Sequence, residues 1–160
     1  SKSDLEIFIH KNDLPYVEDD TNLDNDFDRN FLRNEIIPSL GKRWSKLPER
    51  AALTSLTAKK KKLSLDFMLE KNFKKEISTG IIERAKFIET PSFLIEELIR
   101  LILRKKGIAL PSQKVLSEIM NVFFHKKPSN ESYVEWSRKD GEQIGGKVFS
   151  EHNDIILKKK

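Results

Sequence analysis

The sequence predicts a mainly α protein of the α+β class, with a long connecting helix and a small helical domain closed by a short antiparallel β-sheet at the C-terminus. Between residues 48 and 123, apolar residues recur at helical spacing in three segments. Past Pro128 the apolar residues change to the two-residue alternation of strands. With 160 residues, 38% of them hydrophobic, the chain can bury one ordinary core or two small ones.

The first helix is expected to begin at a capping box, Ser3-Asp4-Leu5-Glu6. Its apolar residues are Leu5, Phe8 and Ile9. The pair Tyr16-Val17 predicts a short strand or an extended segment, because Pro15 disfavours helix at the residue before it. An acidic loop follows.

A second helix is expected from Arg29, with Asp28 as its N-cap. Pro38 predicts a kink or a stop, and Gly41 predicts a break. The apolar face of this helix is formed by Phe31, Leu32, Ile36 and Leu40.

A long helix is predicted from Pro48 to Lys71, since proline fits the first turn of a helix. Four consecutive lysines must point all round a helix, so the segment is expected to be a half-exposed connection. The lysines are Lys59, Lys60, Lys61 and Lys62, and the apolar stripe is Leu53, Leu56, Leu63 and Phe67.

Residues 72–90 carry Gly, Thr and Ser between apolar residues, which predicts a linker into a second core. Thr90-Pro91 then begins a helix that is apolar on almost all sides from Phe93 to Leu103, which predicts a buried central helix ending at Gly107. Ser112 is expected to cap a further helix, whose stripe is Leu116, Ile119, Met120 and Phe123.

The C-terminal segments predict strands. Apolar alternation occurs around Tyr133 to Trp136, at Val148-Phe149 and at 155–157. Asn153-Asp154 is expected to form the turn between the last two strands, which gives a small antiparallel sheet.

Charge divides the chain unevenly. Residues 1–38 carry a net charge of −6 and residues 39–160 a net charge of +11. A basic surface attracts phosphate backbones, although solubility alone accounts for it equally well. The absence of cysteine fits a reducing cytoplasm, and no apolar run approaches the roughly 20 residues that span a bilayer. Because the chain begins with Ser1 rather than Met, we expect a piece of a longer protein.

Three apparent sites are rejected. Residues 141–147 match G-x-x-x-x-G-K, but Val148 stands where a phosphate-binding loop needs Ser or Thr. Asp20, Asn22 and Asp24 match the start of a calcium loop that lacks its glycine and its final glutamate. The three histidines, His10, His125 and His152, are isolated from other metal ligands. No metal site is expected.

Aromatic residues near basic ones can stack nucleobases, although at these spacings they more often belong to a core. The candidates are Trp44, Trp136 and Phe123-Phe124. Clusters of basic residues can together follow an RNA backbone if the fold brings them to one face. The expected nucleic-acid-binding residues are Lys59, Lys60, Lys61, Lys62, Arg104, Lys105 and Lys106, with Lys74-Lys75, Lys126-Lys127 and Lys158 to Lys160 as further clusters.

The stretch from Glu18 to Leu40 resembles the E-D-x-[ST]-N-x-D...R-N-x-[LI]-R-x-x-[IV]-[LI]-P-x-L signature of tRNA(Ile)-lysidine synthetases. The matching residues are Glu18, Asp19, Thr21, Asn22, Asp24, Arg29, Asn30, Leu32, Arg33, Pro38 and Leu40, and Trp44 falls where the family often has tryptophan. Beyond residue 44 the resemblance is looser but continues in order.

The resemblance implies three segments: residues 1–44 as the tail of the N-terminal catalytic domain, 45–75 as a connecting helix, and 76–160 as a tRNA-binding domain. In this family ATP activates the C2 oxygen of the wobble cytidine of tRNA(Ile) as an adenylate, and the side-chain amine of lysine displaces AMP. The S-G-G-x-D-S loop that binds ATP, with Mg²⁺, does not occur in this sequence. The fragment is therefore expected to be inactive alone, cytoplasmic and without a cofactor of its own, and a homodimer is left open.

By the same resemblance, the rim of the active site is expected to contain Arg29, Asn30, Arg33, Glu18 and Asp19. An arginine fork suits the carboxylate of lysine or a phosphate, and carboxylates suit an amine. The acidic side chains can alternatively cap the helix and pair with its arginines, which is the interpretation preferred for Asp28.

The rival hypothesis is a free-standing helical adaptor for protein or RNA, without catalysis. In this case the stripe from Leu53 to Phe67 would bind a partner helix.

Overall fold

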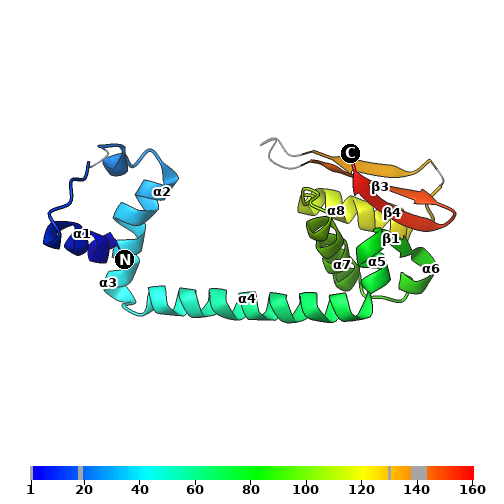
Figure 1. The fold of residues 1–160 in the computed structure, drawn as a ribbon, viewed down its shortest axis with the longest axis horizontal. Helices are drawn as coiled ribbons and strands as arrows, with labels where there is room; N and C mark the ends of the chain where they lie inside the picture. The colour runs from blue at the N-terminus through cyan, green and yellow to red at the C-terminus, as the bar shows by residue number, and fades with distance from the viewer. Residues whose placement is uncertain (1, 18–19, 130, 138–143) are drawn as a thin grey trace. The chain divides into compact units, whose positions relative to one another are not determined.

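The computed structural model describes residues 2–17, 20–129, 131–137 and 144–160. The chain divides into two compact units, Ser1–Lys59 and Lys60–Lys160, with the boundary inside one long helix. Helices dominate both units, and a small antiparallel sheet lies near the C-terminus (Figure 1). The predicted fold class, mainly α within α+β, is confirmed.

The first unit contains short helices around residues 20–27, which are called the polar loop below. Helix α1 spans Lys2–Lys11, a 3-10 turn spans Asp20–Leu23, and helix α2 spans Asp28–Phe31. Of the two alternatives predicted for Tyr16-Val17, the strand is wrong, because residues 14–17 form no regular secondary structure. Tyr16 instead packs edge-on against His10, with ring centroids 5.7 Å apart.

Helix α2 continues through a π-helical segment, Leu32–Ile36, into α3, Ile37–Arg43. Pro38 was expected to kink or stop the helix, and Gly41 to break it. The π segment explains why the helix persists, because the amide of Ile37 donates five residues back to the carbonyl of Leu32 immediately before the proline. A π turn thus lies where a proline would disrupt a regular α-helical ladder. Gly41 lies inside α3, which ends at Arg43.

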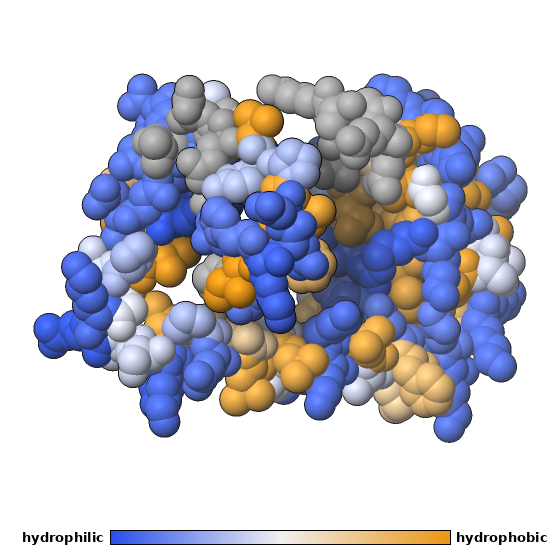
Figure 2. Space-filling model, turned by 60° about the vertical axis from the view of Figure 1, so that its left-hand side comes forward, coloured by the Kyte–Doolittle hydropathy of each residue, from blue (hydrophilic) through white to orange (hydrophobic). Residues whose placement is uncertain are grey.

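Hydrophobic side chains of the first unit are largely open to solvent. Leu5, Phe8 and Phe31 are exposed, and Asn30 is the only fully buried side chain among the described residues of this unit. Figure 2 shows hydrophobic side chains at the surface among hydrophilic ones. This unit therefore has no apolar core of its own within its described residues.

Helix α4 spans Leu47–Asn72, in agreement with the predicted connecting helix. The predicted stripe does not pack, since Leu53, Leu56, Leu63 and Phe67 are all exposed. Leu65 and Leu69, one turn apart, contact the core of the second unit instead. The burial of α4 is confined to its C-terminal part.

The linker predicted over 72–90 is wrong. Helix α5 spans Lys74–Thr79, strand β1 spans Ile81–Glu83 and helix α6 spans Arg84–Phe87. Gly80 makes the turn from α5 to β1, with a left-handed φ of 78° and its amide bonded to the carbonyl of Glu76.

The central helices agree with prediction. Helix α7 spans Ser92–Lys105 and is followed by Gly107 with a φ of 62°. Helix α8 spans Gln113–Met120 and continues as a π segment, Asn121–His125. The Ser112 hydroxyl accepts a hydrogen bond from the amide of Val115, which confirms the predicted cap.

The sheet has the order β1-β4-β3-β2, with every neighbouring pair antiparallel. Strand β2 spans Tyr133–Trp136, β3 spans Gly146–Glu151 and β4 spans Asp154–Lys159. The turn between β3 and β4 is His152-Asn153, one residue earlier than predicted, and both residues have positive φ.

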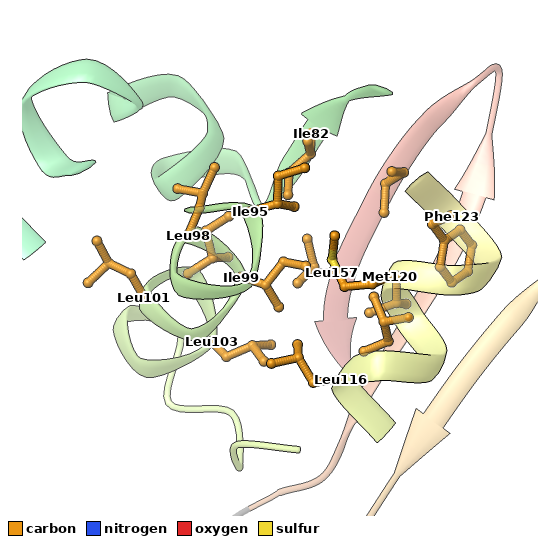
Figure 3. Packing of buried hydrophobic residues seen from close by; sticks show 14 of the residues in the cluster. Ile82, Ile95, Leu98, Ile99, Leu101, Leu103, Leu116, Met120, Phe123 and Leu157 are labelled. Carbon is orange, nitrogen blue, oxygen red and sulfur yellow. The ribbon is translucent and has the colours of Figure 1, made fainter. Parts of the chain in front are cut away.

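The core lies between helices α7 and α8 and one face of the sheet (Figure 1). Figure 3 shows Ile99 of α7 and Met120 of α8 pointing toward the strand that carries Leu157. Leu98, Ile99 and Ile102 are fully buried. The second unit therefore holds the hydrophobic core that the apolar pattern predicted for it.

The glycines of the phosphate-loop look-alike belong to this packing. A β-carbon on Gly146 would lie 2.3 Å from the ring of Trp136, and one on Gly145 would lie 2.1 Å from the Trp136 carbonyl oxygen. The indole N–H of Trp136 donates to the Ala109 carbonyl over 2.6 Å. These two glycines let Trp136 lie against β3, which agrees with the rejection of a phosphate site; residues 141–143 of the motif lie outside the described residues.

Strand β1 is tied to α5 and α6 through Glu83. Its carboxylate oxygens lie 2.6 Å from Lys75 Nζ and 2.5 Å from Lys86 Nζ. The hydrogen bond from Lys75, and then that from Lys86, lowers the pKa of Glu83 from 4.5 to about 2. Because this pKa is lower in the folded state, the stabilisation is present above pH 4.5 and is lost as the pH falls from about 4.5 to about 2.

We expect an NMR titration of the Glu83 carboxylate to have its midpoint at about 2. Replacing both partners, Lys75→Met with Lys86→Met, should return the midpoint toward 4.5 because both charged donors are lost. A midpoint near 4.5 in the unmodified chain would contradict the ion-paired geometry.

Candidate functional site

The polar loop is held onto the following helix by two asparagines one turn apart. The side-chain amide of Asn30 donates to the carbonyls of Thr21 over 2.6 Å and Asp24 over 2.8 Å. Asn34 reaches the carbonyl of Asn22 over 3.3 Å and the side chain of Asn25 over 3.0 Å. The loop conformation is therefore set by helix side chains, because carbonyls at positions 21, 22 and 24 all accept from them.

Asn30 occupies an unusual environment for a polar side chain. It is fully buried, and its Oδ1 has no hydrogen-bond partner among the described residues. Leaving such an acceptor unpaired costs roughly 1–3 kcal/mol. Asn30 was predicted as an active-site residue; the structure gives it the role of positioning the loop, and a role at the rim stays a prediction.

The two predicted arginines are exposed on the helix beside this loop. The guanidinium of Arg29 lies 5.7 Å from the centroid of the Phe27 ring. Arg33 lies in the π segment, and four residues are close to one turn, so the two arginines share a face of the helix. Within the part of the chain that the structure describes, neither arginine forms an ion pair, so both can approach an anionic ligand. Glu18 and Asp19 lie outside the described residues.

Asp28 is not the N-cap that the sequence predicts. Helix α2 includes Asp28, and its N-cap is Phe27, whose carbonyl accepts from the amides of Asn30 and Phe31. The helix therefore begins one residue earlier than expected. Asp28 still lies in the first turn, where a carboxylate is favourable to the helix dipole.

Most of the predicted nucleic-acid-binding cations are engaged within the second unit. Lys62 and Arg104 share the carboxylate of Asp66, and Arg104 Nη2 lies 3.0 Å from its Oδ1. Lys62 also lies 3.5 Å from Glu97. These contacts join α4 to α7.

The next two cations are similarly engaged. Lys105 pairs with Glu70 over 2.7 Å, and Lys106 donates to the carbonyls of Ser78 and Thr79 at the end of α5. Asp66, Glu70 and Glu97 thus neutralise part of the positive charge expected of these residues. By contrast, Lys59, Lys60 and Lys61 are exposed on α4.

Two lysines of the sheet also lie over aromatic rings. Lys147 Nζ is 4.3 Å from the centroid of Tyr133, and Lys158 Nζ is 4.6 Å from the centroid of Phe149. The register pairs Tyr133 with Phe149, so both rings lie on the face of the sheet opposite the core. Exposed Tyr133 and Glu135 alternate with buried Val134 and Trp136 along β2. This two-residue alternation is the signal in the sequence that indicates the outward face.

A basic pocket lies where α3 meets α4. It is lined by Arg43, Trp44, Ser45, Lys46, Leu47 and Arg50. Of the aromatic residues that were expected to belong to a core, Trp136 and Phe123 do so, whereas Trp44 is 53% exposed. The expectation of burial is therefore wrong for Trp44, because the turn between the two helices places it at the surface.

The described residues contain no group of three or more His, Cys, Asp or Glu side chains that could hold a metal ion. Within the same residues, no helix has both the length and the apolar character needed to cross a bilayer.

Residues 1–40 match the PP-loop domain family, ATP_bind_3. This match covers the polar loop and the helix that follows it, which together make up a quarter of the chain.

The chain is similar to tRNA(Ile)-lysidine synthases over most of its length. It is 30% identical to the tRNA(Ile)-lysidine synthase of Coxiella burnetii over 98% of this chain and 36% of that protein. It is 32% identical to that of Photorhabdus laumondii over 74% of this chain and 27% of that protein, and 32% identical to that of Buchnera aphidicola over 84% and 31%. The chain spans about a third of the length of these relatives. The predicted resemblance to tRNA(Ile)-lysidine synthases is confirmed by these similarities.

Proposed function

We propose that this chain is a segment of an ATP-dependent ligase that joins lysine to the wobble cytidine of tRNA(Ile). The observation that carries the proposal is the similarity to a tRNA(Ile)-lysidine synthase over 98% of the chain, together with the PP-loop match at residues 1–40. ATP, with Mg²⁺, would bind to a part of the parent protein outside these 160 residues. The substrates of the parent would be tRNA(Ile), lysine and ATP.

The chemistry follows from the proposed reaction. The C2 oxygen of cytidine attacks the α-phosphate of ATP and releases pyrophosphate, and the side-chain amine of lysine then displaces AMP from the adenylate. Arg29 and Arg33 present two guanidinium groups on one face of a helix whose loop is fixed by Asn30. Such groups suit either the carboxylate of lysine or a phosphate.

The second unit would contribute tRNA binding as a separately folded domain. Its net positive composition supports contacts to phosphates. Lys60 and Lys61 are exposed at its start, whereas Lys62, Arg104, Lys105 and Lys106 are paired within the unit. We assign the first group to contacts with the tRNA backbone and the second group primarily to holding α4 against α7 and α5.

A second candidate is the helical adaptor without catalysis. The observation that favours it is the exposure of Leu53, Leu56, Leu63 and Phe67 along α4, because large exposed apolar side chains can mark a partner surface. This candidate predicts no preference for tRNA over another polyanion.

Binding of the chain to a tRNA(Ile) transcript tests the two candidates. We expect weak binding whose affinity falls about tenfold or more between 50 and 200 mM salt, since counterions are released from each phosphate contacted. The double substitution Lys60→Ala with Lys61→Ala should make the slope of log affinity against log salt concentration shallower by about one or two. Lys11→Ala, on α1, is the matched control. Affinity independent of salt, or equal affinity for heparin, would contradict the proposed tRNA contact.

A further inference from the structure

Trp44 is unusually exposed for a tryptophan. Tryptophan is usually largely buried in folded proteins. Here the side chain is 53% exposed and lines a pocket of about 500 Å³ between the end of α3 and the start of α4. The other tryptophan, Trp136, is buried and donates its indole N–H to the Ala109 carbonyl. Trp44 therefore presents a large aromatic surface outside the core.

The backbone around Trp44 is fixed on both sides. Its amide donates to the Leu40 carbonyl over 2.8 Å, and its carbonyl accepts from the amide of Leu47 over 2.9 Å. The indole thus projects from a hydrogen-bonded turn between two helices. A ligand that stacks on it meets a surface whose backbone is already ordered, so less ordering entropy is lost on binding.

The lining of the pocket is basic. Arg43, Lys46 and Arg50 contribute three cations, and among the described residues no acidic side chain lines the pocket. Residues 42–50 hold four basic residues and one acidic residue, although residues 1–38 carry a net charge of −6. Within the first unit the positive charge is therefore concentrated at this junction, where it can complement an anion.

Arg43 lies over the indole, with its guanidinium carbon 5.4 Å from the ring centroid. An exposed cation–π contact contributes only about a two- to fivefold factor in an equilibrium. Stacking of a nucleobase on an aromatic ring contributes a factor of about 5 to 150 in affinity. A base can therefore replace Arg43 on the ring, and the released guanidinium can pair with the adjoining phosphate.

We propose that this pocket binds an unpaired nucleotide of RNA, with the base stacked on Trp44 and the flanking phosphates paired with Arg43, Lys46 and Arg50. A plain phosphate site would not need the indole, and an apolar peptide would not need three cations. The choice of RNA as the nucleic acid rests on the proposed function.

Tryptophan fluorescence gives a direct test, because the sequence has two tryptophans and Trp136→Phe leaves Trp44 as the sole emitter. The probes are a short single-stranded RNA, the same strand in a duplex, and inorganic phosphate. We expect single-stranded RNA to protect Trp44 from acrylamide quenching, and we expect the duplex and phosphate to protect it much less. Equal protection by phosphate, or quenching unchanged by bound RNA, would overturn the proposal.

Variants of the otherwise unmodified chain provide the second measurement. Trp44→Leu should weaken binding of single-stranded RNA about tenfold or more, whereas Trp44→Phe keeps a stacking surface and should retain most of the affinity. Arg43→Ala should weaken binding and increase the accessibility of Trp44 to acrylamide. If every variant folds, equal affinity of Trp44→Leu and the unmodified chain for single-stranded RNA would refute the site.

The two levels of proposal can fail separately. If tRNA(Ile) binds with a steep salt dependence while Trp44 stays open to quencher, this site is refuted and the proposed function stands. If single-stranded RNA protects Trp44 but tRNA(Ile) binds no better than heparin, the site stands and the proposed tRNA function is refuted.

Discussion

Arg33→Ala in the full-length protein is expected to lower kcat/KM for lysidine formation about 100-fold, because a charge-assisted pair with a substrate anion is lost. Arg33 is exposed beside the loop clamped by Asn30 and lies one turn from Arg29. A rise in KM for lysine would assign it to the lysine carboxylate. A fall in kcat alone would assign it to phosphate groups in the transition state.

Arg33→Lys is the informative companion variant. Lysine keeps the charge but lacks the planar fork, so we expect it to restore only a small part of the activity. Lys11→Ala removes an exposed cation of α1 in the same unit and should leave the activity unchanged. Normal kinetics for Arg33→Ala would remove Arg33 from the active-site rim.

Leu98→Ala is expected to destabilise the second unit by about 3 kcal/mol. Leu98 is fully buried in α7, and truncation of a core leucine removes apolar contacts and leaves a cavity, at a typical cost of 2–5 kcal/mol. The measurement is urea unfolding followed by the fluorescence of Trp136, which lies in the same core, in a Trp44→Phe background. The midpoint should fall while the m-value stays the same.

Phe93→Ala is the matched control on the same helix. Phe93 is 71% exposed, so its truncation should change the free energy of unfolding by less than about 0.5 kcal/mol. Equal destabilisation by the two substitutions would contradict the orientation of α7 against the sheet.

The parts of the fold that sequence predicts are those whose signals are local. The apolar run of α7, the Ser112 cap and the C-terminal hairpin all depend on residues close in the chain, and all three are present. Strand β1 was missed because it has three residues and pairs with β4, more than 70 positions later. A short edge strand has no periodicity of its own, and only its distant partner makes it a strand.

The same distinction applies to the candidate site. The motif around Arg33 is found from sequence because the resemblance is dense there, but the burial of Asn30 depends on where the loop folds back. Lys105 has the composition of a phosphate contact, yet it pairs with Glu70, 35 positions earlier. Composition shows which charges exist, and only the fold shows which are already paired.

Trp44 is the opposite case. The sequence placed it among aromatic residues that usually belong to a core, and nothing local to residues 42–47 predicts that the ring stays at the surface. Its exposure follows from the turn in which α3 ends at Arg43 and α4 begins at Leu47.

Incorporation of labelled lysine into tRNA(Ile) by the full-length protein, with ATP present, tests the proposed function directly. We expect ATP-dependent attachment of one lysine at the wobble cytidine, with AMP and pyrophosphate released, and no attachment when that cytidine is replaced by uridine. If the folded full-length protein attaches no lysine to tRNA(Ile), or attaches it equally to the uridine-substituted tRNA, the proposed function is wrong.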